Sequence, residues 1–499
     1  MQKKSAYKIA ILGAGIGGLA TAALLAKDGH DVTVFEKNAT AGGRASQWKH
    51  KGFSFDLGPS WYLMPDVFDR FFADVGTTAA KELKLKRMEH QYRIFWDDGQ
   101  QVDIVSDLDT NLKTFEKIEP GSSAPFLRYL AESKLKYDLS VAHFLYRNMD
   151  TLFDLLTPVT MRYGLSLDLF TSMDRYVRRF FTTEKMQQLI QYTLVFLGGA
   201  PVNTPALYSL MSHLDFNLGL FYPMGGFSEV PKAFVRIAKR HGVKFEFNAP
   251  IEQLVTNSGA ITHVVVKGKK LKFDAVISNG DYKHTEDLLS DQSTRNYSVQ
   301  SWEKKTLTPS AFLLYLGVKG KLPELEHHNL YFGKKWTDHF KTIFENPSWP
   351  VTPSLYINMP SKTDPTVAPK GHENLMILVP ISAGLPESEA WRESYAQFIL
   401  SYMKETMGLD LKDRIVCQRI FSVTDFEKAY NSFKGNALGG LAHTLFQSAI
   451  WRPSNKSKKL NNLFFAGANT VPGIGVPISL ISAELARERI KVWANSRNK

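Results

Sequence analysis

The sequence contains almost no cysteine. Its 499 residues include a single one, Cys417. This excludes a disulfide within the chain, and it excludes structural zinc sites built on two or more cysteines. Cys417 lies in an alternating stretch, so we expect a buried thiol on a strand. One cysteine also fits a reducing compartment, and we expect a cytoplasmic protein.

Long apolar runs are also missing. No segment reaches the ~18 consecutive apolar residues of a transmembrane helix, so any membrane contact should be peripheral. Helix-turn-helix, RNA-recognition and zinc-finger patterns are missing as well, and we predict no nucleic-acid partner. Lys and Arg nevertheless outnumber Asp and Glu by 61 to 49, a net charge of +12. General solubility or attraction to an anionic membrane surface would each explain this charge.

A metal site is not predicted either. His327 and His328 are adjacent, and neighbouring residues on a strand point to opposite faces of the sheet. No pattern of acids or cysteines completes a ligand set around them. We therefore interpret both histidines as structural.

The N-terminus carries a nucleotide-binding pattern. A short apolar strand is followed by Gly13, Gly15 and Gly18 in the spacing G-x-G-x-x-G, then by a helical pattern and a second strand that ends at Glu36. Such glycines allow a tight turn, close approach of a pyrophosphate and close helix packing, and the acid accepts hydrogen bonds from a ribose. This unit predicts a dinucleotide site that suits FAD or NAD.

Two further glycine-rich motifs favour FAD. Gly42-Gly43-Arg44 follows the second strand and would place amides and a guanidinium beside a pyrophosphate. Residues 465–477 form a late strand, a glycine-rich turn and the start of a helix, a geometry that can lay amides against a flavin ring. No second glycine-rich β-α-β unit is present, which argues against a separate NAD(P)H domain.

The stretches between these motifs have another character. Residues 68–220 are dominated by helical patterns and aromatic side chains. Strand patterns return from residue 243 onwards, with a predicted strand pair at 354–359 and 375–380. A final helix is predicted over 476–490. Nucleotide-domain signals at both ends and in the middle of the chain predict a discontinuous domain.

Taken together, these motifs resemble one known family. The motifs that carry the resemblance are residues 13–18, Glu36, 42–44, 55–60, Tyr222-Pro-Met-Gly-Gly226 and residues 277–280. They resemble those of the FAD-dependent carotenoid desaturases of the bacterial phytoene desaturase type, within the amine oxidase-like flavoproteins. Three later motifs match the desaturases more narrowly: Pro360-Ser-x-x-Asp364, Gln447-Ser-Ala-x-x-Arg452-Pro453 and residues 469–477. The resemblance covers nearly the whole chain.

The resemblance implies an α/β fold with three parts. A discontinuous Rossmann-like FAD-binding domain would comprise residues 1–70, 222–300 and 415–499. A mixed-sheet substrate domain would comprise 71–100 and 301–414. Residues 101–221 would form a helical region that associates with the membrane and contributes to a substrate tunnel.

The resemblance also implies a non-covalent FAD and the residues that hold it. Ile251 would pair its backbone with the adenine, and the last glycine-rich segment would surround the ribityl chain and the flavin ring. The full predicted set is Gly13, Ala14, Gly15, Gly17, Gly18, Glu36, Lys37, Gly43, Arg44, Gly58, Pro59, Ser60, Ile251, Gly467, Ala468, Gly475, Val476 and Ile478.

The sequence departs from the family at one informative point. Desaturases commonly have a histidine before the proline of the last loop, whereas this chain has Val471-Pro472. An acid–base role at that position is therefore in doubt. Asp150 and Asp154 are candidates for a catalytic acid, although each is more typical of a solvated helix charge. We predict no particular catalytic residue.

Four functions remain open at this stage. The first is desaturation of phytoene or a C30 analogue such as diapophytoene, with hydride transfer to flavin N5 and a quinone or oxygen as acceptor. The second is a related carotenoid isomerase, saturase or oxygenase. The third is an amine or amino-acid oxidase, which would need a polar recognition site that no motif indicates. The fourth is an escort protein that binds FAD without turnover.

Overall fold

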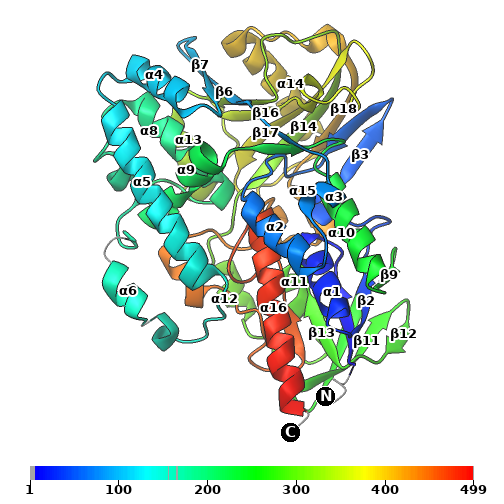
Figure 1. Ribbon diagram of the computed structural model, residues 1–499. Helices are drawn as coiled ribbons and strands as arrows, with labels where there is room; N and C mark the ends of the chain where they lie inside the picture. Colours follow the sequence, from blue (N-terminus) through cyan, green and yellow to red (C-terminus); the bar gives the residue numbers. More distant parts are fainter. Residues whose placement is uncertain (1–5, 156, 165–166, 498–499) are drawn as a thin grey trace.

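The computed structural model describes residues 6–155, 157–164 and 167–497, which build two large sheets (Figure 1). The first sheet has five strands in the order β19-β13-β1-β2-β9, and all neighbours are parallel. Its strands are β1 (Lys8–Leu12), β2 (Asp31–Phe35), β9 (Lys244–Glu246), β13 (Ala275–Ser278) and β19 (Leu463–Phe465). Segments from both ends and the middle of the chain therefore share one sheet.

Both faces of this sheet are covered, as expected for parallel strands. On β1, Ile9 and Ile11 face one core, while Ala10 and Leu12 face another. The first core is closed by α1 (Ile16–Lys27), α10 (Glu229–Arg240) and α16 (Val476–Arg497), and α16 lies along α1 (Figure 1). A three-stranded sheet of β10 (Ile251–Asn257), β11 (Ala260–Val266) and β12 (Lys269–Leu271) contributes to the second core.

The second large sheet is mixed. It has seven strands in the order β18-β14-β17-β16-β15-β6-β7, and only β15 and β6 run parallel. These strands are β6 (His90–Trp96), β7 (Gln101–Val105), β14 (Ser310–Lys319), β15 (His328–Phe332), β16 (Leu355–Asn358), β17 (His372–Ile381) and β18 (Ile415–Phe421). Successive side chains of β14 alternate between two cores: Leu313 and Tyr315 face one, and Phe312 and Leu314 face the other.

Helices cover both faces of the seven-stranded sheet (Figure 1). The core on one face includes residues of α4 (Leu108–Ile118), α5 (Ser123–Ser140), α7 (Met173–Val177), α8 (Glu184–Gln191) and α13 (Trp336–Phe344). The opposite core includes residues of α14 (Glu389–Met407). The other helices are α2 (Pro65–Asp74), α3 (Ala79–Glu82), α6 (Pro158–Tyr163), α9 (Leu210–His213), α11 (Tyr282–Asp287), α12 (Val299–Glu303) and α15 (Val423–Tyr430). Short ladders join β3 (Gln47–His50) to β4 (Phe53–Asp56) and β5 (Leu85–Arg87) to β8 (Phe221–Pro223).

Several sequence predictions can be compared with these elements. The predicted strand pair is confirmed, because β16 and β17 pair antiparallel. Cys417 is a buried thiol on β18, also as predicted. Within the described ranges, no helix combines the length and apolar character needed to cross a membrane.

Two predictions need correction. The region predicted to be helical, residues 101–221, begins with a strand, because β7 pairs with β6 in the mixed sheet. The predicted boundary at residue 415 assigns β18 to the FAD-binding segments, whereas β18 pairs with β14 in the mixed sheet. The reason is that β18 is an alternating edge strand, with no nucleotide-domain signal of its own.

Candidate functional site

One cavity of about 490 Å³ is lined by residues of both large sheets and the loops that follow their strands. Most residues predicted to hold FAD line it: Gly13, Gly15, Gly17, Glu36, Lys37, Gly43, Arg44, Gly58, Pro59, Ser60, Ile251, Ala468, Gly475, Val476 and Ile478. The other three, Ala14, Gly18 and Gly467, lie behind this lining and are considered below.

The turn between β1 and α1 is packed too tightly for side chains. Gly13 has φ +94°, a conformation that favours glycine. A Cβ at Gly18 would lie 2.2 Å from the Gly13 carbonyl oxygen. A Cβ at Gly17 would lie 2.7 Å from the Cα of Gly467, so the first and last segments of the site touch. The turn thereby brings the free amides at the start of α1 to the cavity, a geometry that suits an anion.

Glu36 is fixed where the second strand ends. Its side chain is buried, and its carboxylate accepts hydrogen bonds from the backbone N–H of Ala14 and of Asn38, each at 2.8 Å. Ala14 therefore acts from behind the lining, by orienting Glu36. Since Glu36 also lines the cavity, its remaining acceptor capacity faces the position expected for a ribose.

Arg44 carries a buried donor that suits an anion. Its Nη2 donates to Ser432 Oγ at 2.6 Å and to the Asn436 carbonyl at 3.3 Å. Its Nε is buried and has no hydrogen-bond partner among the described residues. Burial lowers the pKa of Arg44, and the nearby Tyr430 and Asp281 oppose this effect. A guanidinium retains its charge in this setting, so a pyrophosphate of FAD fits the free donor.

The C-terminal segment closes the same end of the cavity. Ser482 Oγ of α16 accepts the Gly467 N–H at 3.0 Å and thereby fixes the turn after β19. Gly475 has φ +116° and directly precedes α16. Because Gly475 and Val476 line the cavity, the N-terminus of this 22-residue helix is directed into it. The positive end of the helix dipole is therefore available to an anionic group in this part of the cavity.

The other end of the cavity is apolar. Side chains from several distant elements line it, among them Leu145, Leu197, Leu210, Met211, Leu214, Ala311, Leu313, Leu378 and Phe426. Leu313 and Leu378 are cross-strand partners on β14 and β17, so the mixed sheet supplies one wall. Such a surface recognises shape and excludes water rather than forming specific hydrogen bonds.

A small polar cluster interrupts this apolar lining. The hydroxyl of Tyr356 lies 2.7 Å from Ser60 Oγ, 2.7 Å from His328 Nδ1 and 2.9 Å from Trp61 Nε1. Ser60, Trp61 and Tyr356 line the cavity. The cluster connects the end of the motif at residues 55–60 to β15 and β16 of the mixed sheet.

Behind Trp61 lies a buried carboxyl group. The ring of Trp61 packs against those of Tyr92 and Tyr192, whose hydroxyls donate to Asp215 Oδ2 at 2.8 and 2.9 Å. Burial raises the pKa of Asp215 to about 7, although both tyrosine hydrogen bonds act in the opposite direction. Asp215 is therefore a carboxyl that changes its charge near neutral pH.

The two predicted acid candidates lie elsewhere. Asp150 forms ion pairs with Lys456 at 2.7 Å and Arg489 at 2.6 Å, and it is not among the residues that line the cavity. Burial acts to raise the pKa of Asp150, but hydrogen bonds from both cations lower it. Asp154 accepts the backbone N–H of Asp150 and Thr151. Both acids thus have structural partners.

The histidine pair differs from its prediction. The rings of His327 and His328 are 4.3 Å apart rather than on opposite faces, because His327 precedes β15 and is not constrained by the pleat. His327 Nδ1 lies 2.8 Å from Thr363 Oγ1, while His328 belongs to the Tyr356 cluster. Burial lowers the pKa of His327 to about 3 and lowers that of His328 as well, so both are neutral.

Sequence reasoning missed several cavity residues. Asn279 is the most central: the Cβ positions of Gly15, Gly17 and Gly467 all fall within 2.7 Å of its side-chain amide. The motif at residues 277–280 was an available signal, although it was not assigned to the site. His443 is another, since it lines the cavity beside Ile474 and accepts the Ile474 N–H at 3.4 Å. No sequence spacing indicated this contact.

Comparisons with known proteins agree with this architecture. Residues 16–490 match the family model described as flavin containing amine oxidoreductase. A solved putrescine oxidase variant superposes with a TM-score of 0.62 at 15% identity, covering 98% of this chain and 100% of that one. An oxidoreductase from Methanosarcina mazei also gives 0.62 at 16% identity, covering 96% and 100%. The chain therefore belongs to the flavin-containing amine oxidoreductase family.

Relatives with higher sequence identity show which members of that family the chain resembles. A carotenoid 3,4-desaturase of Haloarcula japonica is 44% identical, covering 98% of this chain and 99% of its own. A zeta-carotene-forming phytoene desaturase of Myxococcus xanthus is 36% identical over 98% and 95%. A 4,4'-diapophytoene desaturase of Staphylococcus haemolyticus is 32% identical over 96% and 98%. The predicted resemblance to the carotenoid desaturases is thus confirmed.

Proposed function

We propose that the protein is an FAD-dependent carotenoid desaturase that extends the conjugated system of a long isoprenoid hydrocarbon. The observation that carries this proposal is a single cavity with two chemically different ends. Glycine turns, Glu36, Arg44 and two helix N-termini form one end, and aliphatic side chains form the other. The relatives named above act on carotenoids, which supports the same substrate class here.

Bound FAD would supply a two-electron acceptor able to take hydrogen from carbon as hydride. In this proposal, Glu36 and Ile251 hold the adenosine, while Arg44 and the start of α1 hold the pyrophosphate without a covalent bond. Gly475, Val476 and Ile478 surround the flavin ring. The aliphatic wall holds a carbon–carbon bond against that ring and excludes water.

An amine oxidase reaction is less well supported by the cavity. A carboxylate at the substrate end would be the natural partner of a charged ammonium group held away from water. Among the described residues that line the cavity, the acids are Glu36 and Asp281. Glu36 accepts the Ala14 and Asn38 amides, and Asp281 accepts the His284 and Phe433 amides, so both belong to the cofactor end.

The decisive experiment is anaerobic incubation of FAD-loaded protein with phytoene or diapophytoene in liposomes. Loss of the oxidised flavin absorption together with new polyene bands would support desaturation, and the band positions would count the steps. Oxidised flavin that persists without polyene, in a preparation first shown to be reducible by dithionite, would contradict it. Isomerase, saturase, oxygenase and oxidase activities would then be assayed with the same preparation.

We also propose that the protein works at a membrane surface, through exposed aromatic side chains. Phe153, Phe170 and Phe446 are 81%, 90% and 73% exposed, and Trp451 packs against Phe446. Exposed aromatic side chains of this kind favour a lipid interface over water.

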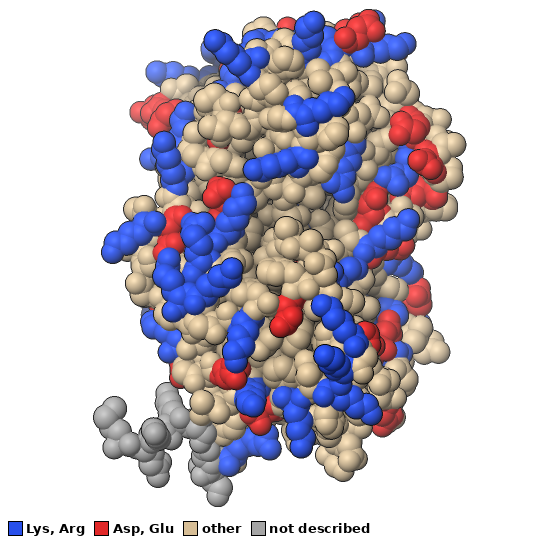
Figure 2. All heavy atoms as spheres, turned by 90° about the vertical axis from the view of Figure 1, so that its right-hand side faces the viewer, with Lys and Arg blue, Asp and Glu red and all other residues tan. Residues whose placement is uncertain are grey.

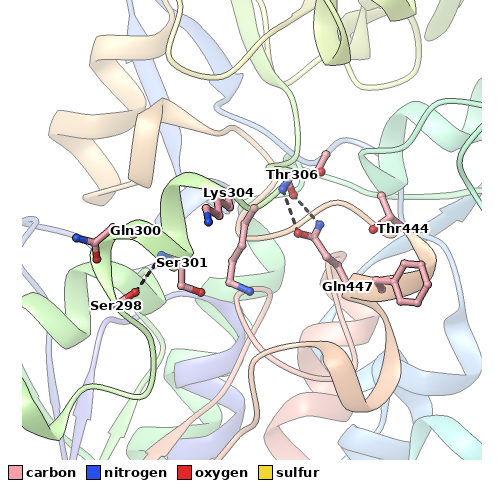
Figure 3. A pocket seen from close by; sticks show the side chains of 9 residues that line it. Ser298, Gln300, Ser301, Lys304, Thr306, Thr444 and Gln447 are labelled. Carbon is pink, nitrogen blue, oxygen red and sulfur yellow. Dashed lines mark hydrogen bonds between the residues drawn. The ribbon is translucent and has the colours of Figure 1, made fainter.

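A polar pocket of about 640 Å³ lies next to Phe446 and suits an anionic headgroup. It is lined by Lys304, Lys305 and several hydroxyl groups, and Gln447 fixes one rim by bonding both the N–H and the carbonyl of Thr306 (Figure 3). Positive charge is not confined to this pocket. Figure 2 shows Lys and Arg side chains spread over the face with α10 and β9, so the net charge alone does not single out a membrane-facing surface.

The membrane proposal is tested by co-sedimentation with liposomes at moderate salt. The double variant Phe446→Ser/Trp451→Ser should lose most of its binding to anionic vesicles. Val351→Ser/Trp391→Ser, which alters side chains that are also exposed but lie elsewhere, should bind like the wild type. Equal binding of both double variants, or no binding by the wild type, would contradict the proposal.

The electron acceptor is proposed to be a quinone or oxygen. The support is that the sequence offers one glycine-rich β-α-β unit, which the FAD would occupy, and no second such unit for a pyridine nucleotide. A quinone would also share the membrane with the substrate. Reoxidation of dithionite-reduced protein by a soluble quinone or by air, but not by NAD(P)+, is the expected result.

A further inference from the structure

A fully buried arginine lies directly behind the glycine-rich segment that follows β19. Arg452 is 2% exposed and has one of the largest fully buried side chains in the described chain. Its guanidinium donates to three backbone carbonyls: Thr470 at 3.1 Å, Ala468 at 3.3 Å and Gln447 at 3.4 Å. Two of these carbonyls belong to the segment that lines the cofactor end of the cavity.

The positive charge of Arg452 has no carboxylate partner among the described residues. Two partly buried arginines do: Arg487 pairs with Asp28 at 2.5 Å, and Arg489 pairs with Asp150 at 2.6 Å. Burial lowers the pKa of Arg452 to about 10, although Tyr208 acts in the opposite direction. The side chain therefore remains charged at neutral pH. A buried charge without a counter-ion is unfavourable unless another group compensates for it.

The hydrogen bonds of Arg452 also orient the peptides in front of it. In a trans peptide, the N–H points away from the carbonyl. Because the Ala468 carbonyl points back to Arg452, the N–H of Asn469 points to the other side of the segment, and both Ala468 and Asn469 line the cavity. Thr470 Oγ1 in turn donates to the Pro453 carbonyl at 2.7 Å, which locks the two segments together.

We propose that Arg452 is a positioning residue that stabilises the reduced form of bound FAD and so raises its reduction potential. With FAD bound, one carbon would give up a proton together with both electrons of its C–H bond, as hydride to the flavin. The neighbouring carbon would release its hydrogen as a proton, the electron pair left behind would form the new C=C bond, and the reduced flavin would carry one additional negative charge. The guanidinium and the amides that it orients offset that charge. This inference rests on the FAD binding of the proposed function, but not on the identity of the substrate.

The test is the midpoint potential of bound FAD in Arg452→Gln and Arg452→Lys, measured by spectroelectrochemistry without carotenoid. Glutamine can still donate to a carbonyl but carries no charge, whereas lysine keeps the charge. We expect Arg452→Gln to disfavour two-electron reduction at least tenfold, a negative shift of about 30 mV, relative to both wild type and Arg452→Lys. The FAD spectrum of each variant is recorded first, so loss of cofactor is seen separately from a shift in potential.

A matched control is Arg414→Gln. Arg414 also bonds two backbone carbonyls, those of Lys319 and Lys321, but it lies at the edge of the mixed sheet. Its variant should keep the wild-type potential. Equal potentials in Arg452→Gln and Arg452→Lys would overturn the proposal. It would also be overturned if Arg452→Gln and Arg452→Met both failed to retain FAD while Arg452→Lys retained it, because Arg452 would then be structural.

Discussion

The two ends of the cavity are built in different ways. At the cofactor end, backbone atoms make much of the surface: glycines touch glycines, helix N-termini are directed inward, and polar side chains such as Glu36, Arg44 and Asn279 add to it. At the substrate end, side chains from the mixed sheet and the helical region make the surface. A cofactor with charged groups requires fixed backbone geometry, whereas a hydrocarbon requires a cavity that is large enough and excludes water.

This difference predicts how each end tolerates substitution. Added atoms at the cofactor end would collide with the backbone, and moving the backbone costs more free energy than moving a side chain. Added atoms at the substrate end would change the shape of the cavity.

Gly18→Val should abolish the site. Its Cβ would lie 2.2 Å from the Gly13 carbonyl oxygen, so the turn between β1 and α1 must move. We expect a loss of at least about 4 kcal/mol in the free energy of unfolding and no retained FAD. Thermal denaturation and the visible flavin spectrum check this. Gly280→Ala is the control, because its Cβ would meet neighbours only at 3.5 Å or more, and it should stay folded.

Asp215→Asn should change the pH dependence of stability. Burial raises the pKa of Asp215 to about 7, so between pH ~4 and ~7 the folded protein holds a proton that the unfolded chain releases. The unfolding free energy of the wild type therefore decreases as pH rises through this window, by up to about 4 kcal/mol. The unfolding free energy of Asp215→Asn should not decrease in this way, because asparagine does not titrate. Melting temperatures from pH 5 to 8 should fall more steeply for the wild type, and parallel curves would contradict the prediction.

Arg44→Gln should weaken FAD binding with little change in fold. Removing the buried charge and its free Nε donor should cost about 2 kcal/mol of binding, roughly thirtyfold in Kd. Titration of apo-protein with FAD, followed by flavin fluorescence, measures this. The wild-type affinity should also fall with salt more steeply than that of the variant. Arg414→Gln should bind FAD normally, and equal weakening in both variants would indicate a non-specific effect.

Leu378→Phe should change the product more than the stability. Leu378 faces the cavity from β17, so a larger side chain takes up space that the substrate would use. We expect products with fewer conjugated double bonds, seen at shorter wavelength, and less than about 1 kcal/mol change in stability. Ile377→Phe, on the buried opposite face of the same strand, should lose about 1–3 kcal/mol but keep the product distribution. If Ile377→Phe changed the products and Leu378→Phe changed only the stability, the proposed substrate end of the cavity would be contradicted.

The same difference explains what the sequence could predict. The cofactor end follows from local motifs, because Gly13–Gly18, Glu36 and Arg44 each act within a few residues of a strand end. Most predicted residues accordingly line the cavity. The strands β6 and β7 were not predicted individually, although Tyr92, Ile94 and Trp96 alternate as inward-facing residues and an Asp-Gly turn follows.

The substrate end could not be predicted in this way. Leu145, Met211, Leu313 and Phe426 come from four elements with no shared spacing, and each reads locally as an ordinary core residue. Asp215 and Arg452 are ionisable side chains in the interior, but their burial depends on segments that lie far away in the chain. Only the assembled fold shows that one contacts two tyrosines and the other three carbonyls.

The contact between Gly17 and Gly467 has a consequence for biosynthesis. α1 leaves the ribosome before its partners, Gly467 and α16, which lie far later in the sequence. The apolar face of α1 therefore stays partly uncovered until those segments have been synthesised. A chain interrupted before residue 476 would lack part of the cavity lining, so cofactor capture would follow the synthesis of α16.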